Sequence, residues 1–183
     1  GKTISDGTDT GTVTLTALHS TLGADLSGVD ANTVTAAFDG NGTFTGDIGN
    51  AVVTVGDGNT LTTTAAKASG KTINEAGGDD ATVALTALHS TLAANLSGIT
   101  TNAVTAAFGG NGTFTGNLGT AVVTVADNVS LTGAANKLVA HTINKSGTGD
   151  NNGAIVVTLN AAADTAVNLT QLTGSAVITS ITV

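Results

Sequence analysis

The chain has 183 residues, enough for one medium domain or two to three small ones, and it carries a net charge of −8 with five basic residues, all of them Lys. Because so few cations cannot neutralise a phosphate backbone, we expect no nucleic-acid partner. No stretch approaches 18 consecutive apolar residues, which predicts no membrane insertion, and the absence of Cys removes any dependence on disulfides.

The sequence repeats itself after about 70 residues. Leu15 to Thr54 returns as Leu85 to Thr124 with most residues unchanged, and a third copy opens at His141. Self-similarity at a fixed period is typical of stacked repeats, in which each unit buries its apolar face against the next. We therefore divide the chain into copy 1 (1–70), copy 2 (71–140) and a partial copy 3 (141–183), and we expect one continuous stacked unit.

Within each copy, the composition favours short strands. Thr is about one residue in five, and period-2 alternation recurs, as in TVTLT (12–16) and VVTV (52–55), between turns rich in Gly, Asn and Asp. The interior would be built from small aliphatic side chains and four Phe. The best helical exception is TALHSTL at 16–22 and 86–92, which is short enough to be only a turn.

A weaker echo inside the copies predicts how the strands stack. Leu26 resembles Phe44 and Val34 resembles Val53, so the pattern returns after roughly 18 residues. A coil of about 17 to 18 residues would give four coils per copy and a rod of ten coils, about 50 Å long. The Phe residues would then fill the interior. This pattern favours an all-β fold, namely a parallel β-solenoid (β-helix).

Tandem Ig-like β-sandwich domains are the alternative. Seven apolar strand centres can be counted in each copy, a number that suits a small Greek-key sandwich. The absence of Trp, Tyr and Cys and the short copy argue against it, so the parallel solenoid is preferred.

Three stretches carry a resemblance to a known class of protein. LTTTAAKASGKTI (61–73), LSGITTNAVTAAF (96–108) and GTFTGNLGTAVVTV (112–125) resemble the β-strand repeat regions of very large secreted bacterial surface proteins, which are adhesin-like or surface-layer-like. The resemblance covers nearly the whole chain and implies an extracellular, non-catalytic, structural or adhesive role. It carries over no functional residue.

The recurring pairs His19-Ser20 and His89-Ser90 are the only motif that suggests nucleophilic catalysis. No acid recurs at a matching place to orient the imidazole. In an extended segment the two side chains would also face apart. We therefore expect no enzyme and no catalytic residue, and we interpret His141, which replaces a Lys of the earlier copies, as a solvated polar position.

Acidic turns raise the question of structural Ca²⁺, which needs six to eight oxygen ligands. Asp25 and Asp47 become Asn95 and Asn117 in the next copy, so a cage present in every unit is not expected. Calcium remains an alternative in four turn positions, and no other cofactor is expected. These positions are Asp6, Asp9, Asp79 and Asp80.

The final stretch, AVITSITV (176–183), is β-prone, apolar and free of charge, Pro and Gly. Exposed edges of this kind pair with other chains. We expect self-association here, through Ala176, Val177, Ile178, Ile181 and Val183.

The function expected from these features is that of a non-catalytic structural protein in an extracellular bacterial assembly, such as a filament, surface layer or matrix. Its partner would be itself, as a homopolymer or within a longer parent chain. The alternative is an adhesin stalk or binding module, at the cell surface, that recognises glycans or ice through Thr-rich faces.

Overall fold

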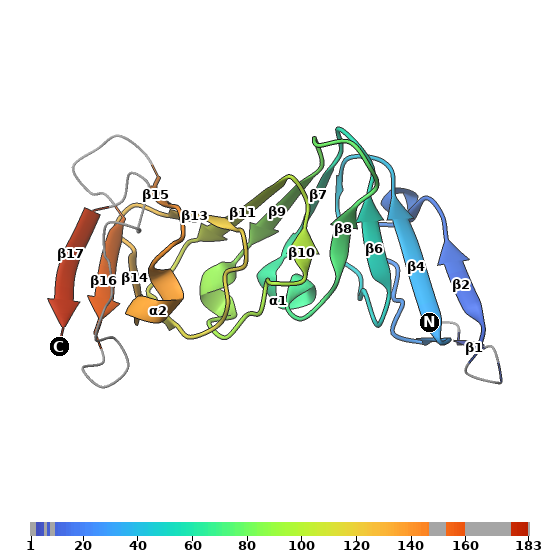
Figure 1. The fold of residues 1–183 in the computed structure, drawn as a ribbon, viewed down its shortest axis with the longest axis horizontal. Coiled ribbons are helices and arrows are strands. Elements are labelled where there is room, and N and C mark those ends of the chain that lie inside the picture. Colours follow the sequence, from blue (N-terminus) through green and yellow to red (C-terminus); the bar gives the residue numbers. More distant parts are fainter. Residues whose placement is uncertain (1–2, 6, 8–9, 147–152, 160–176, 183) are drawn as a thin grey trace.

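The computed structural model describes residues 3–5, 7, 10–146, 153–159 and 177–182. Over these residues the protein is an all-β parallel solenoid of about seven turns, stacked along one long axis (Figure 1). Neighbouring strands in every sheet run parallel, whereas the strands of an Ig-like sandwich run antiparallel. The predicted solenoid is confirmed, and the alternative of tandem sandwiches is wrong.

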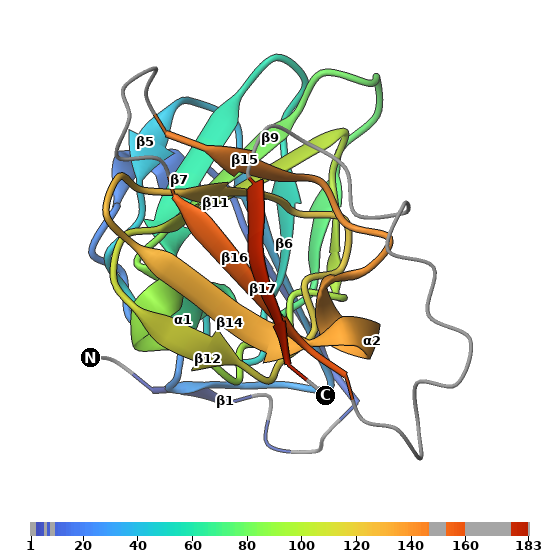
Figure 2. The same ribbon diagram turned by 90° about the vertical axis from the view of Figure 1, so that its left-hand side faces the viewer.

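Each turn passes along three walls, which Figure 2 shows in a view along the stack. Wall 1 consists of β2 (Thr12–Leu15), β4 (Thr33–Phe38), β6 (Val52–Val55), β8 (Ile73–Glu75) and β10 (Ile99–Thr100). Wall 2 consists of β5 (Gly42–Thr43), β7 (Thr60–Thr64), β9 (Thr82–Thr86), β11 (Ala103–Phe108), β13 (Val122–Val125) and β15 (Ile143–Lys145). Wall 3 has β1 (Ile4–Ser5) and β3 (Val29–Asp30) at one end and β12 (Gly112–Phe114), β14 (Ser130–Ala134), β16 (Ala154–Thr158) and β17 (Val177–Thr182) at the other.

Four short helical segments occupy corners and gaps between these strands. The segments η1 (Leu18–Ser20) and η2 (Leu88–Ser90) are 3₁₀ turns within the TALHSTL motifs, which confirms that the motif is only a turn. The helices α1 (Ala65–Ala68) and α2 (Ala135–Leu138) follow β7 and β14. Neither helix was predicted, because four residues are too few to show helical periodicity.

Inward-facing side chains form columns through the stack. On wall 1, Ala36, Val53 and Ile73 lie opposite one another on consecutive coils, and each is at most 1% exposed. On wall 2 the corresponding column contains Leu85, Ala106, Val123 and Ile143. The four Phe side chains are 0–1% exposed, so they fill the interior as predicted. Alternation along each strand places the apolar set inside and most Thr outside; Thr63 is an inward exception, and its hydroxyl donates to the Phe44 carbonyl oxygen at 3.0 Å.

The predicted coil length is wrong for most of the rod. Thr35 pairs with Val52, close to the predicted spacing, but Val13 pairs with Val34 and Ser130 pairs with Ala154, and both of these coils are longer. The echo between Leu26 and Phe44 also gave a wrong register, because the bridge between Asp25 and Asp47 places Leu26 beside Ile48. The corners differ in length, so no single period describes the coils.

The repeat and the coil do not coincide. Thr33–Phe38 lies on wall 1, whereas its copy, Ala103–Phe108, lies on wall 2. Likewise Thr60–Thr64 lies on wall 2 and its copy, Ser130–Ala134, lies on wall 3. The coil lengths themselves are preserved, since β4 pairs with β6 in the same register in which β11 pairs with β13. One copy therefore makes three turns and advances by one wall.

Asn and Gly both tolerate a positive φ, so Asn-Gly pairs favour left-handed turns. The pairs at Asn41 and Asn111 do not form such turns. Neither Asn has a positive φ. Instead, the Asn111 side-chain oxygen accepts the N–H of Ser130 in the next coil at 2.7 Å, and Asn41 makes the same bond to Thr60. A Cβ on the following glycine, Gly112, would lie 2.7 Å from Leu92 Cδ2, so a larger residue there would require the Leu92 side chain to move.

Candidate interaction surfaces

The two His side chains cover buried Phe rings. His19 meets Phe38 edge-on with ring centroids 6.2 Å apart, and His89 meets Phe108 in the same way. The Nδ1 atom of His89 accepts the backbone N–H of Gly109 at 3.2 Å. In copy 1 the Nδ1 of His19 is buried and has no hydrogen-bond partner. The partner of His89 is thus a main-chain amide and not the carboxylate that a catalytic triad requires.

The third histidine, His141, is only partly solvated, whereas the sequence analysis expected a solvated position. It is partly buried beside Asn117, Asn136 and Lys137, where it helps to line a depression of about 120 Å³. Burial lowers the pKa of His141 below its usual value because the charged imidazolium loses hydration.

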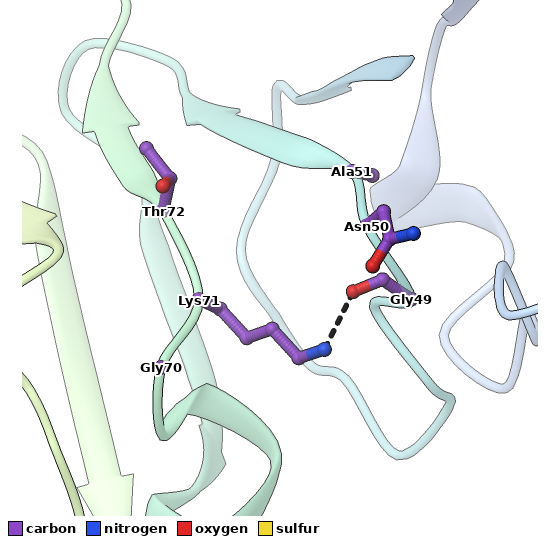
Figure 3. Close-up of a pocket in the computed structure, with 6 residues that line it drawn as sticks. All are labelled: Gly49, Asn50, Ala51, Gly70, Lys71 and Thr72. Atoms are coloured by element: carbon purple, nitrogen blue, oxygen red, sulfur yellow. Dashed lines mark hydrogen bonds between the residues drawn. The ribbon is translucent and has the colours of Figure 1, made fainter. Parts of the chain in front are cut away.

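A similar depression where copy 1 meets copy 2 has a volume of about 170 Å³ and is lined by Gly49, Asn50, Gly70, Lys71 and Thr72. Figure 3 shows the Lys71 side chain reaching across it, and the Lys71 ammonium donates a hydrogen bond to the carbonyl oxygen of Gly49. Pockets for small molecules usually enclose about 300 to 1,000 Å³. Both depressions are therefore small for a ligand pocket, and the Lys71 contact ties two coils together.

The Asp residues of copy 1 shape their own turns. The Asp25 carboxylate accepts hydrogen bonds from the Ser27 hydroxyl at 2.6 Å and the Ser27 N–H at 3.0 Å, which lower the pKa of Asp25. Asn95 makes the same contacts with Ser97 in copy 2. A side-chain amide oxygen can accept the same two bonds as a carboxylate oxygen. This explains why Asn95 can replace Asp25 in copy 2 although the charge is lost.

Of the four calcium candidates, Asp6 and Asp9 lie outside the described residues. Asp79 and Asp80 are exposed in the loop between β8 and β9. The part of the chain that the structure describes holds no group of three or more His, Cys, Asp or Glu side chains arranged for a metal ion. Calcium binding at these turns stays a prediction.

The carboxylate of Glu75 holds this loop in place, and sequence reasoning missed it. Its two oxygens accept the N–H of Ala81 and the N–H of Asn102, each at 2.9 Å. Glu75 therefore connects its own coil to the loop and to the next coil. The bond from Ala81 is the main cause of a lowered pKa at Glu75, with the bond from Asn102 adding to it against the opposing effect of desolvation.

We expect Glu75→Gln to reduce stability at neutral pH and to have little effect in acid. A group whose pKa falls on folding stabilises the fold above its unfolded pKa, about 4.3, and this contribution disappears as the pH drops through the lower folded value. Urea unfolding from neutral pH down to about pH 3 tests this. Asp127→Asn removes the same charge at another turn and serves as the control. A constant difference between wild type and Glu75→Gln at all pH values would contradict the role assigned to the carboxylate.

The outward positions of the described strands of walls 1 and 2 are uncharged, whereas Asp30 is exposed on β3 of wall 3. In the described strands, charged residues occur only at strand ends, namely Asp30, Glu75 and Lys145. On wall 2 the outward positions of β5, β7, β9, β11 and β13 hold only Thr, Ala and Val. They are Thr43, Thr60, Thr62, Thr64, Thr82, Ala84, Thr86, Ala103, Thr105, Ala107, Val122 and Thr124.

The Thr pairs on the walls are interrupted. Thr12 and Thr14 of β2 lie opposite Thr33 and Thr35 of β4, but Val52 follows on the next coil of that column. The methyl and hydroxyl array is therefore regular over only two coils of wall 1.

The strand β17 is the last in its sheet and pairs with β16. Its backbone contains Val177, Ile178 and Ile181 of the predicted self-association segment, while Ala176 and Val183 lie outside the described residues. No other described strand pairs with β17, so one edge of this strand has no partner within the described chain.

Comparisons with protein-family models, with curated proteins and with solved structures found no match to this chain. Within the described residues, no helix has the length and apolar character needed to cross a membrane.

Proposed function

We propose that the protein is a non-catalytic structural element of an extracellular bacterial assembly, in which rods of this kind join end to end. The observation that carries this proposal is the strand β17, whose sheet ends at an edge with no partner in the described chain. A parallel strand with an open edge is a template for another strand. The strands β1 and β2 end their sheets at the opposite end of the rod and supply the complementary edge.

The composition of the chain supports an extracellular location. A Cys-free, acidic, Thr-rich surface stays soluble without reducing conditions and has no thiol to oxidise. Contacts between the two opposite ends of identical rods are head-to-tail, and they produce an open filament when successive rods continue along one axis. The interior supports a mechanical role, because the columns of Val, Leu, Ile and Phe leave the stack tightly filled.

Blocking the open edge of β17 tests this function. Ser180→Pro and Ile181→Pro each remove one backbone N–H from β17. Alternate N–H groups of a strand point to opposite edges. One of the two variants therefore changes the open edge, and the other changes the edge that pairs with β16. We expect the variant that changes the open edge to lose filaments in electron micrographs while its unfolding midpoint stays near that of the wild type. Removal of residues 176–183 provides a third variant. Unchanged filaments in all three, or no wild-type assembly, would contradict end-to-end joining.

A binding module for glycans or ice is the second candidate, and the Thr-rich walls favour it. Thr60, Thr62 and Thr64 present three hydroxyls and three methyls along one strand. A glycan array and an ice-recrystallisation assay separate the two functions, because a purely structural rod gives no signal in either.

A further inference from the structure

We propose that Asn95 is a site of N-linked glycosylation, at which the side-chain nitrogen takes an oligosaccharide from a lipid-diphosphate donor. This inference rests on the extracellular location in the proposed function and not on the end-to-end contact, so either can fail without the other. Asn95 opens the triplet Asn95-Leu96-Ser97, in the segment between η2 and β10. Asn-x-Ser/Thr is the acceptor pattern for this modification.

The conformation of the Asn95 side chain selects this triplet from the others. The chain holds six such triplets, so the pattern alone selects none of them. The Asn95 Oδ1 accepts the Ser97 hydroxyl at 2.8 Å and the Ser97 N–H at 3.3 Å. This arrangement is an Asx turn, and it joins the acceptor amide to the hydroxyl that the pattern requires. The six triplets begin at Asn41, Asn95, Asn111, Asn128, Asn144 and Asn168, the last of which lies outside the described residues.

The two hydrogen bonds favour reaction at the Asn95 amide. An amide nitrogen is a weak nucleophile, because its lone pair is delocalised into the carbonyl group. Hydrogen bonds to the carbonyl oxygen polarise the amide, which makes the Nδ2–H easier to deprotonate. The Nδ2 then attacks C1 of the donor sugar. The C1–N bond forms, the C1–O bond to the lipid diphosphate breaks, and the Nδ2 proton passes to a base of the transferase.

The side chain of Asn95 is accessible although its backbone is fixed. Asn95 and Ser97 are exposed, and Leu96 between them is 1% exposed and anchors the triplet in the core. The Asn95 N–H donates to the Ser69 Oγ on one adjacent coil, and the Leu96 N–H donates to the Asn117 carbonyl oxygen on the other. Among the described residues, none is hydrogen-bonded to the Asn95 Nδ2, so this nitrogen is open to a donor.

Three other described triplets have a different geometry. Asn41 and Asn111 lead directly into β5 and β12, and their side-chain oxygens accept N–H groups of the next coil. Asn128 has a φ of 60°, whereas Asn95 is not among the residues of positive φ. Because positioning of the reacting group controls the rate, we expect modification of Asn95 to exceed that of Asn41 or Asn111 by about tenfold or more.

Copy 1 contains an equivalent turn that cannot be modified. The Asp25 carboxylate accepts the hydroxyl and the N–H of Ser27 in the same way, but it has no nitrogen to receive a sugar. Asp25→Asn supplies the missing nitrogen in a turn of the same geometry. If the turn selects the site, this variant gains a second glycan.

Incubating the folded protein with an oligosaccharyltransferase that recognises Asn-x-Ser/Thr alone, and with its lipid-linked oligosaccharide, tests this proposal. Mass spectrometry of the intact protein and of its peptides counts and locates the glycans. We expect one glycan on the wild type, at Asn95, and two on Asp25→Asn. Ser97→Ala should lose the glycan and Ser97→Thr should keep it, since Thr also carries the hydroxyl. Thermal melts followed by circular dichroism establish that the variants are folded.

Three results would overturn the assignment of Asn95. The first is an unmodified Asn95 while a short Asn-x-Thr peptide is modified in the same reaction. The second is modification of Asn41, Asn111 or Asn128 to the same extent as Asn95. The third is an Asp25→Asn variant that gains no glycan, which would show that the turn does not select the site. Loss of filaments, by contrast, bears only on the end-to-end contact.

Discussion

Replacing Gly116 with Ala is expected to lower the free energy of unfolding by about 3 kcal/mol or more. A Cβ at this position would lie 2.0 Å from the Ala94 carbonyl oxygen and 2.8 Å from the Ala94 nitrogen. These are backbone atoms of the adjacent coil, so no side-chain rotation relieves the overlap. The coils must separate, which breaks the nearby hydrogen bonds from Gly116 N–H and Asn117 N–H to that coil.

The repeat supplies a second test of the same contact, and another glycine supplies the control. Gly46 is the equivalent of Gly116 in copy 1, and its Cβ would lie 1.8 Å from the Ala24 carbonyl oxygen. Gly23→Ala should change stability by less than about 1 kcal/mol, since its nearest neighbour is Thr45 Oγ1 at 3.9 Å and its φ is negative. Urea unfolding of the three variants measures the difference. Similar stabilities for Gly116→Ala and Gly23→Ala would show that the coils do not need this close approach.

Replacing Phe114 with Ala should cost about 3 to 5 kcal/mol. Phe114 is 1% exposed, and it lies opposite Gly133 on the next coil, where no side chain can fill the space that the ring leaves. Leu138 packs over Gly133 on that coil. Phe114→Leu keeps most of the volume and should cost less than about 2 kcal/mol.

The exposed neighbour Thr113, on the same strand, is the matched control for Phe114. Thr113→Ala removes a side chain from the outer face of β12 and should change stability by about 0.5 kcal/mol or less. Denaturant unfolding of the three variants gives the comparison. A cost for Phe114→Ala no larger than that for Thr113→Ala would mean that the Phe residues do not support the stack.

Much of the fold could be predicted from the sequence because alternation along each strand is a local property. In TVTLT the alternation alone indicates which side chains face inward, and Val83 and Leu85 of the equivalent segment are indeed buried. The coil length could not be predicted in this way. It depends on corners such as the loop between β8 and β9, whose path is set by the bonds of Glu75 to Ala81 within the loop and to Asn102 on the next coil.

The candidate surfaces were predicted less completely. The sequence indicated the apolar run at the end of the chain, and part of that run forms β17. It did not indicate that His19 and His89 cover Phe rings, because that contact joins residues on adjacent coils that lie far apart along the chain. Nor did the sequence show that the charged residues lie mainly outside the strands, because the strand and corner boundaries that separate them from the Thr-rich strands were not known.

The advance of one wall per copy has a geometric consequence for any array built from this repeat. Successive copies are related by a threefold screw, so a feature grafted onto one loop would point in three directions in turn and return to its starting direction with every third copy. At about 4.8 Å per turn, that pitch is about 48 Å. In such an array the grafted features would follow a spiral around the rod and would not line up along one side.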